Sequence, residues 1–115
     1  MSLWSSYYKE RLNWDSIEVE GQGFVLYAIR PPLASIEDIY IAPQFRKSNL
    51  ALGLANQVSS LAREAGCSEL RTQVWLGTKG SERAVRTNIA YGFKMIEANN
   101  NCILFSKELG GADGK

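Results

Sequence analysis

The sequence predicts an α+β fold with a mixed, mostly antiparallel central sheet and helices on both of its faces. Two apolar segments, Phe24–Arg30 and Ile36–Ile41, flank a Pro-Pro pair that ends the first of them, as expected for consecutive antiparallel strands. An amphipathic segment, Asn49–Ala65, then leads to a further apolar segment at Leu70–Leu76, which predicts one parallel βαβ crossover. Two strands around the turn-forming triplet Asn99-Asn100-Asn101 close the chain.

The chain has 115 residues and a net charge of +1. This length supports one hydrophobic core, so we expect a single domain over residues 1–109 and a disordered tail at 110–115. The charge balance gives no reason to expect nucleic acid or a membrane surface as a partner. No apolar run reaches the roughly 18 residues of a membrane helix, and no signal peptide is recognisable.

The residue types limit the chemistry that the chain can perform. It contains no histidine, which excludes a Ser-His-Asp triad, a Cys-His pair and a histidine-based zinc site. Cys67 and Cys102 lie too far apart in sequence for a metal motif, and we interpret them as two free thiols in the cytoplasm. Carboxylates, tyrosines, backbone groups or a cofactor must therefore carry any reaction.

The front of the chain predicts a short helix followed by a β-hairpin. Trp4, Tyr8 and Leu12 repeat every four residues, which indicates a helix over Trp4–Leu12. Polar and apolar residues alternate over Asp15–Glu20, as in a half-exposed strand. Gly21-Gln22-Gly23 forms the turn into the apolar strand Phe24–Arg30.

Two further helices and their inner faces follow from apolar periodicity. The inner face of the helix over 49–65 is predicted to hold Leu50, Leu54, Val58, Leu61 and Ala65, and Gly66 ends that helix. A second helix runs from Glu82 to Tyr91, with Ser81 as its N-cap and Gly92 at its end. Its inner face is predicted to hold Ala84, Val85, Asn88 and Ile89. The closing strands are Phe93–Ala98 and Cys102–Lys107.

The segment from Ile36 to Leu54 predicts an anion site, because a buried strand there leads directly into the start of a helix. Free backbone N–H groups and the positive end of the helix dipole converge at such a point. Pro43 ends the strand, and Arg46 and Lys47 lie in the turn. A solvated basic turn is the alternative interpretation of these two cations; together with the helix start, they favour a phosphate ligand.

These residues resemble the GCN5-related N-acetyltransferase (GNAT) family, as a short member. Ile41-Ala42-Pro43 is similar to the family's V-x-P strand end, and residues 46–51 align with its Arg/Gln-x-x-Gly-x-Gly/Ala turn. Ala84, Gly92 and Phe93 match a downstream family pattern on a helix and the next strand. The resemblance covers roughly Glu18 to Leu109, and the family's usual first strand and first helix have no room in front of it.

The resemblance implies that acetyl-CoA lies between splayed parallel strands at Ile36–Ile41 and Leu70–Leu76. Backbone groups of Ile39, Tyr40 and Ile41 would pair with its pantetheine arm, and one N–H would polarise the thioester carbonyl. The turn and helix start would bind its pyrophosphate, which adds Arg46, Lys47, Ser48, Asn49, Leu50, Ala51 and Leu52 to the predicted cofactor site.

Three positions depart from the family pattern. Asn49 replaces a turn glycine, although asparagine tolerates tight and left-handed conformations better than other non-glycine residues. Ser81 replaces an asparagine that often contacts the cofactor, and Asn88 occupies the position of the usual tyrosine acid. Glu37 is the candidate catalytic base, and Asp38 is expected on the opposite face of its strand. The alternative for Glu37 is a surface ion pair.

The resemblance therefore implies an enzyme that transfers an acetyl group from acetyl-CoA to an amine on a small molecule or a peptide. A non-catalytic CoA-binding or protein-interaction module on the same fold is the alternative, since Asn88 cannot act as an acid. A homodimer also remains open, because an uncovered sheet edge can pair with a second copy.

Overall fold

A computed structural model describes residues 2–110, and it confirms the α+β fold. Six strands form one mixed sheet in the order β1-β2-β3-β4-β6-β5, in which only β3 and β4 are parallel. The strands are β1 Asp15–Val19, β2 Gly23–Arg30, β3 Leu33–Ile41, β4 Glu69–Trp75, β5 Lys94–Ala98 and β6 Cys102–Glu108. The helices are α1 Leu3–Leu12, the short 3-10 turn η1 Pro43–Phe45, α2 Leu50–Glu64 and α3 Ser81–Tyr91. The predicted tail lies outside the described residues, apart from Gly110.

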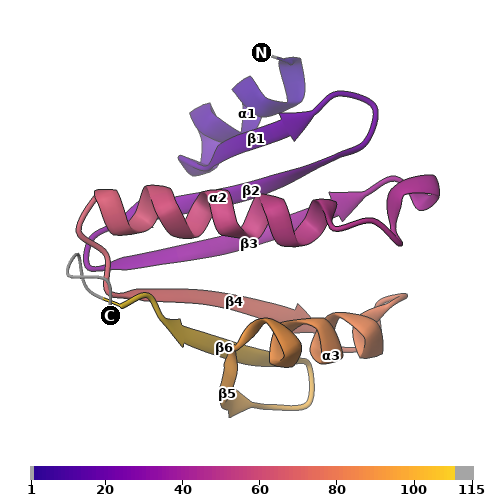
Figure 1. Cartoon of the computed structure of the whole chain (residues 1–115), viewed down its shortest axis with the longest axis vertical. Coiled ribbons are helices and arrows are strands. Elements are labelled where there is room, and N and C mark those ends of the chain that lie inside the picture. The colour runs from indigo at the N-terminus through magenta and orange to yellow at the C-terminus, as the bar shows by residue number, and fades with distance from the viewer. Residues whose placement is uncertain (1, 111–115) are drawn as a thin grey trace.

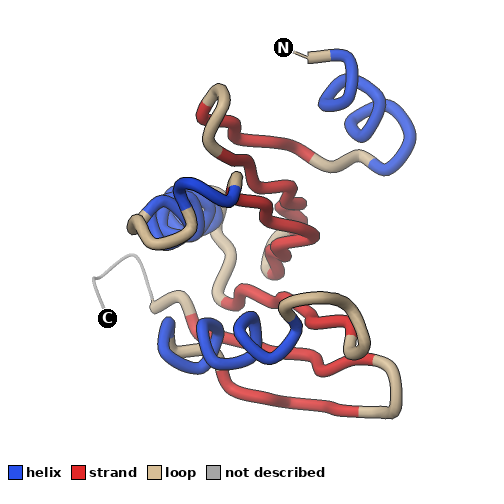
Figure 2. Tube along the Cα trace, turned by 90° about the vertical axis from the view of Figure 1, so that its right-hand side faces the viewer, coloured by secondary structure: helices blue, strands red, loops and turns tan. Residues whose placement is uncertain are grey.

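The helices cover both faces of the sheet. Figure 1 shows α2 lying along β2 and β3, and α3 lying over the other half of the sheet. In the turned view of Figure 2, α1 is on the face opposite α2. None of the helices in the described part of the chain is long and apolar enough to cross a membrane.

The predicted elements are confirmed with small shifts at their ends. The strand predicted from Ile36 already begins at Leu33, directly after the Pro-Pro pair. The strand predicted at 70–76 runs one residue earlier. Asn99 makes the closing turn through its side chain, since its Oδ1 accepts the backbone N–H groups of Asn101 (2.7 Å) and Cys102 (2.9 Å).

Parts of the predicted helix faces are wrong. Leu61 and Ala65 are exposed, whereas Ser59 and Ala62 are buried with Leu54 and Val58. The small side chains of Ser59 and Ala62 let α2 lie close to the sheet, so they replace the larger Leu61 in the contact. In α3, Ile89 is exposed, and the N-cap position belongs to Gly80 with φ 85° rather than to Ser81.

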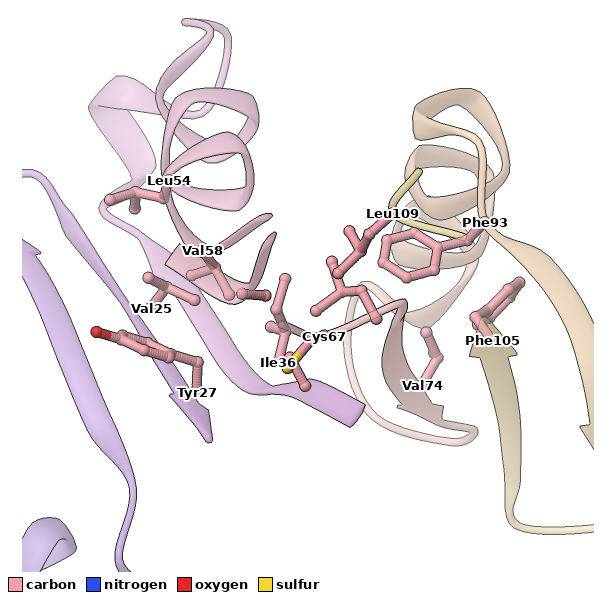
Figure 3. Close-up of a cluster of buried hydrophobic side chains, with 13 residues drawn as sticks. Val25, Tyr27, Ile36, Leu54, Val58, Cys67, Val74, Phe93, Phe105 and Leu109 are labelled. Atoms are coloured by element: carbon pink, nitrogen blue, oxygen red, sulfur yellow. The ribbon is translucent and has the colours of Figure 1, made fainter. Parts of the chain in front are cut away.

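The core is one continuous cluster on the α2 and α3 side of the sheet. Figure 3 shows Leu54, Val58 and Val25 at one end of the cluster and Phe93 and Phe105 at the other. Cys67 and Leu109 lie between the two ends, and both are buried. The two halves of the sheet therefore share a single core.

The parallel contact between β3 and β4 is short. It extends from Leu33, which faces Glu69, to Ile36, which faces Thr72. Beyond that point β3 continues to Ile41 against β2, while β4 continues to Trp75 against β6. Figure 1 shows the two strands diverging toward the end where α2 and α3 begin. The divergence expected between these strands is thus present.

Candidate functional site

The divergence begins at a β-bulge in β3. Tyr27 of β2 faces Ile36, but the next β2 residue, Leu26, faces Asp38, so Glu37 is the extra residue. A bulge bends its strand and increases the local twist. Because the parallel pairing stops at Ile36, the bulge lies at the point where β3 leaves β4.

The bulge brings Glu37 and Asp38 to the same face of the sheet. Glu37 accepts a hydrogen bond from Ser35 Oγ (2.6 Å), two residues earlier on that face. Asp38 lies opposite Leu26, whose neighbour Tyr27 points into the core on the other face. The expectation that Asp38 faces away from Glu37 is therefore wrong, because strict alternation does not hold across a bulge.

The last residues of β3 present backbone groups to the opened edge. The N–H of Ala42 donates to the carbonyl of Gln22 (2.7 Å), so even-numbered residues at this end of β3 are the ones that exchange backbone hydrogen bonds with β2. Tyr40 then pairs with Phe24, while the N–H and C=O groups of Ile39 and Ile41 point the other way, toward the space that β4 has left. Of the three predicted pairing residues, Ile39 and Ile41 face the opened edge and Tyr40 does not.

Two of these outward backbone groups are bonded to side chains of the same chain. The N–H of Ile39 donates to Asp38 Oδ1 (2.8 Å). The carbonyl of Ile41 accepts from Arg46 Nε (2.8 Å), and the Arg46 guanidinium lies 5.6 Å from the centre of the Tyr40 ring. Arg46 is thus held beside the end of β3, where η1 leads toward α2.

The turn and the start of α2 supply further donors. Lys47 and Asn49 are exposed, and Asn49 has φ −91°, so the turn does not require the left-handed conformation of a glycine. The Ser48 hydroxyl donates to the carbonyl of Phe45 (2.6 Å) and accepts the N–H of Leu50 (3.2 Å). Ala51 and Leu52 follow in the first helical turn, where N–H groups precede any intrahelical acceptor.

This arrangement fits an extended ligand that carries amide groups and ends in a phosphate. The opened edge offers strand-like hydrogen bonds, and the helix start with its two nearby cations suits an anion. Two open depressions, of about 360 and 250 Å³, lie elsewhere. They are lined by residues of α2 in the first case and by Leu76 and residues of α3 in the second, with no contribution from β3.

On the α3 side, Asn88 is half-buried and Tyr91 connects the helices. The Tyr91 hydroxyl donates to Asn56 Oδ1 (2.6 Å) and lies 3.2 Å from Ser59 Oγ, both in α2. The centre of its ring lies 5.7 Å from the centre of the Phe93 ring. Tyr91 therefore joins α2 to α3, as a packing residue rather than as a group exposed at the divergence.

The ion-pair alternative for Glu37 receives no support among the described residues. The two ion pairs found there are Lys9–Asp15 and Arg71–Glu69. Asp38 also belongs to this region, and partial burial raises the pKa of its carboxyl, against the lowering effect of the Ile39 N–H. The sequence offers one hint of the bulge, the odd spacing of Ile36 and Ile39, which strict alternation would place on opposite faces. The register with β2 places both on the face of Tyr27 and Val25.

Comparisons with known proteins agree with this geometry. The family model for the acetyltransferase (GNAT) family matches residues 9–87. An aminoglycoside N(6')-acetyltransferase type 1 from Acinetobacter baumannii is 30% identical over 79 residues, which are 69% of this chain and 50% of that protein. The chain thus spans about half the length of the curated relatives it matches.

Solved structures share the fold at low sequence identity. A protein assigned to the GNAT family from Desulfovibrio desulfuricans has a TM-score of 0.76 and 17% identity, and the match covers 91% of this chain and 76% of that one. The PaiA N-acetyltransferase from Thermoplasma acidophilum, in complex with coenzyme A, has a TM-score of 0.68 and 17% identity, with 92% and 68% coverage. The family match spans more than half of the residues and agrees with the diverging strands, and the chain belongs to the acetyltransferase (GNAT) family.

Proposed function

We propose that this chain is an acetyl-CoA-dependent N-acyltransferase that transfers an acetyl group to an amine. The observation that carries the proposal is the end of parallel pairing at Ile36 and Thr72. This end leaves Ile39 and Ile41 facing an open edge directly before the start of α2. Family membership supports the reaction class.

In this proposal the opened edge binds the extended part of the cofactor. Ile39 and Ile41 pair with its amide groups, and Tyr40 holds the strand in place from the β2 side. The phosphates lie at the turn and the first turn of α2, against the remaining cofactor residues. That set is Arg46, Lys47, Ser48, Asn49, Leu50, Ala51 and Leu52, with Asn88 facing the arm from α3.

The bound cofactor supplies an activated acyl group, and the chain supplies position and proton transfer. Ile39 N–H donates to the carbonyl oxygen of the thioester, where negative charge develops. Glu37, oriented by its bond to Ser35, accepts a proton from the substrate ammonium so that the amine nitrogen can attack. The new C–N bond would replace the C–S bond, the thiolate would leave with the bonding electrons, and the second proton that the nitrogen loses after attack would go to the thiolate or to water.

The chain offers no tyrosine acid at position 88, and the reaction does not require one. A thiol has a pKa near 8.5, so a thiolate is a tolerable leaving group at neutral pH. The second candidate, a CoA-binding module without turnover, is favoured by Asn88 alone. It predicts cofactor binding but no acyl transfer.

Titration calorimetry with CoA and acetyl-CoA tests the binding step. Millimolar ligand without heat would refute both candidates. A free-thiol release assay over a panel of amines and peptide N-termini then separates them, since sustained release supports the enzyme. We expect Glu37→Gln to reduce the rate by about 10² to 10⁴, the range for a general base. Glu18→Gln, on β1, is the control and should retain the rate.

The acceptor is proposed to be a small-molecule amine, because the sequence relatives named above are aminoglycoside N-acetyltransferases. Aminoglycosides should therefore head the panel, with polyamines and peptides as comparisons. Release of thiol with a peptide but with no small amine would refute this choice of acceptor while leaving the reaction class intact.

We further propose a homodimer in the cytoplasm. β1 and β5 form the two edges of the sheet, and an edge strand can pair with a second copy. Cys67 and Cys102 are both free thiols, as is usual in a reducing compartment. Light scattering at micromolar concentration tests the assembly, and a mass near the 12.8 kDa of one chain would refute the dimer.

A further inference from the structure

The N–H of Ile39 already has an anionic partner in the absence of any ligand. Asp38 Oδ1 accepts it at 2.8 Å, a usual length for a hydrogen bond to a charged oxygen. The same N–H points toward the opened edge, because in this register Tyr40 and Ala42, and not Ile39, exchange backbone hydrogen bonds with the β2 side. The Asp38 carboxylate therefore occupies the place where the oxygen of a ligand would lie.

We propose that Asp38 competes with the cofactor for the Ile39 N–H, so that this side chain sets the cofactor affinity and moves aside when the cofactor binds. The inference rests on the function proposed above. A carboxylate oxygen resembles a carbonyl oxygen that is gaining negative charge, and the bond shows that this N–H is accessible to such an oxygen. Competition follows because one N–H forms only one good bond in this geometry.

Asp38 is free to move in a way that Glu37 is not. Asp38 is exposed, and among the described residues its side chain makes one hydrogen bond, to the N–H of Ile39. Glu37 is held by Ser35 Oγ at 2.6 Å. The residue Asp38 as a whole is exposed, but neighbouring atoms partly desolvate its carboxyl; this raises the pKa of Asp38 and makes the charged form less favourable than it is in water.

The expected effect follows from the fraction of protein in which the Ile39 N–H is free. A bond that holds about nine molecules in ten closed reduces the apparent affinity about tenfold, equivalent to about 1.4 kcal/mol. This value lies just below the range for a hydrogen bond to a charged group and within the range for a typical hydrogen bond, as suits an exposed carboxylate. Removal of the side chain should therefore tighten cofactor binding by about tenfold.

The test uses the full chain and two readouts, with Asp38→Ala, Asp38→Asn and the control Glu18→Ala. Amide hydrogen exchange, measured by NMR without ligand, reports the Ile39 bond directly. In Asp38→Ala we expect about tenfold faster exchange at Ile39. The amide of Tyr40 should keep its rate, since it reports intact pairing with β2.

Titration calorimetry with CoA is the second readout. Asp38→Ala should bind CoA about tenfold more tightly than the unmodified chain, and Asp38→Asn, which keeps an oxygen but not the charge, should lie between them. Glu18→Ala removes a nearby exposed carboxylate without touching Ile39 and should change the affinity by less than threefold. An equal gain in Glu18→Ala would mean that charge alone governs affinity, and would overturn the competition.

The remaining outcomes are also decisive. Unchanged Ile39 exchange in Asp38→Ala, or CoA binding no tighter than in the unmodified chain, would overturn the role of Asp38 while leaving the proposed function standing. If neither the unmodified chain nor any variant binds CoA at millimolar concentration, the proposed function itself fails, and the competition fails with it.

Discussion

Gly23 is expected to be essential for the position of the end of β3. It faces Ile41 across the β2–β3 ladder, and it does not have a left-handed φ, so its role is to leave space rather than to make a turn. A Cβ atom added there would lie 2.5 Å from the carbonyl oxygen of Tyr40 and 2.8 Å from Ile41 Cδ1. Gly23→Ala must therefore displace backbone at the proposed cofactor edge.

The cost can be estimated from these two contacts. The Ile41 side chain can rotate, but the Tyr40 carbonyl is backbone and must shift by about 0.5 Å or more to reach a normal contact. Overpacking of this kind destabilises the folded state by about 1–3 kcal/mol. Alanine also lowers the entropy of the unfolded chain relative to glycine, which offsets about 0.4–1 kcal/mol of that loss. We expect a net loss of about 1–2 kcal/mol, or roughly 4–8 °C in Tm for a chain of this size.

Urea and thermal unfolding, followed by circular dichroism, measure this loss. Gly53→Ala is the matched control, because a Cβ at that helical position meets no atom within 4 Å. It should raise stability by about 0.5–1 kcal/mol. Calorimetry should also show weaker CoA binding in Gly23→Ala, since Ile39 and Ile41 move with the strand. Unchanged stability and unchanged CoA affinity in Gly23→Ala would refute the reasoning.

Three further predictions concern charges and the helix contact. Lys47→Ala should weaken CoA binding about two- to fivefold, the range for an exposed charge at a helix start, and the loss should be smaller at high salt. Calorimetry at two salt concentrations checks this, and an unchanged affinity would favour the solvated-turn interpretation. Tyr91→Phe removes the hydrogen bond to Asn56 and should lower the free energy of unfolding, measured with urea, by about 0.5–1.5 kcal/mol. A large loss of thiol release in a variant of normal stability would instead identify Tyr91 as the acid. Hydrogen bonds from Arg71 and Ser106 lower the pKa of the Glu69 carboxyl below that of a free glutamate. Its stabilisation is therefore present above the usual glutamate pKa and is lost as pH falls through the lowered one. Glu69→Gln should accordingly show a smaller fall in urea midpoint between pH 6 and pH 3 than the unmodified chain, and equal falls would contradict the assignment.

The strand and helix pattern was predictable because apolar periodicity, Gly66, Gly92 and the Pro-Pro pair mark elements locally. The alternation in β1 and the crossover through α2 led to the correct pairings of β1 to β4, whereas the position of β6 between β4 and β5 was not predicted. The faces of α2 were less predictable, because the burial of Ser59 and Ala62 depends on how closely a helix approaches the sheet. Hydrophobicity alone favours Leu61 over Ala62 at such a contact.

The site was predictable in outline and not in detail. The strand, the turn and the helix start follow from Pro43, Arg46 and Lys47 in sequence. The bulge at Glu37 depends on the register between β2 and β3, which no local pattern fixes by itself. For this reason the sequence placed Asp38 on the wrong face, and the bonds that Asp38 and Arg46 make to the edge of β3 were not foreseen.

Because the parallel contact between β3 and β4 is short, the two halves of the sheet, β1–β3 and β4–β6, are hydrogen-bonded to each other mainly at one end. Thr72 Oγ1 donates to the carbonyl of Ile36 (3.2 Å) where pairing stops, and Ser68 N–H donates to the carbonyl of Pro32 (2.9 Å) at the closed end. The open end has no corresponding β3-to-β4 bond among the described residues, so small rotations of one half of the sheet against the other are limited there by the shared core and by the Tyr91 bonds to α2 rather than by the ladder. A ligand that bridges β3 and α3 would remove that freedom, and it would stiffen the whole sheet rather than a single loop.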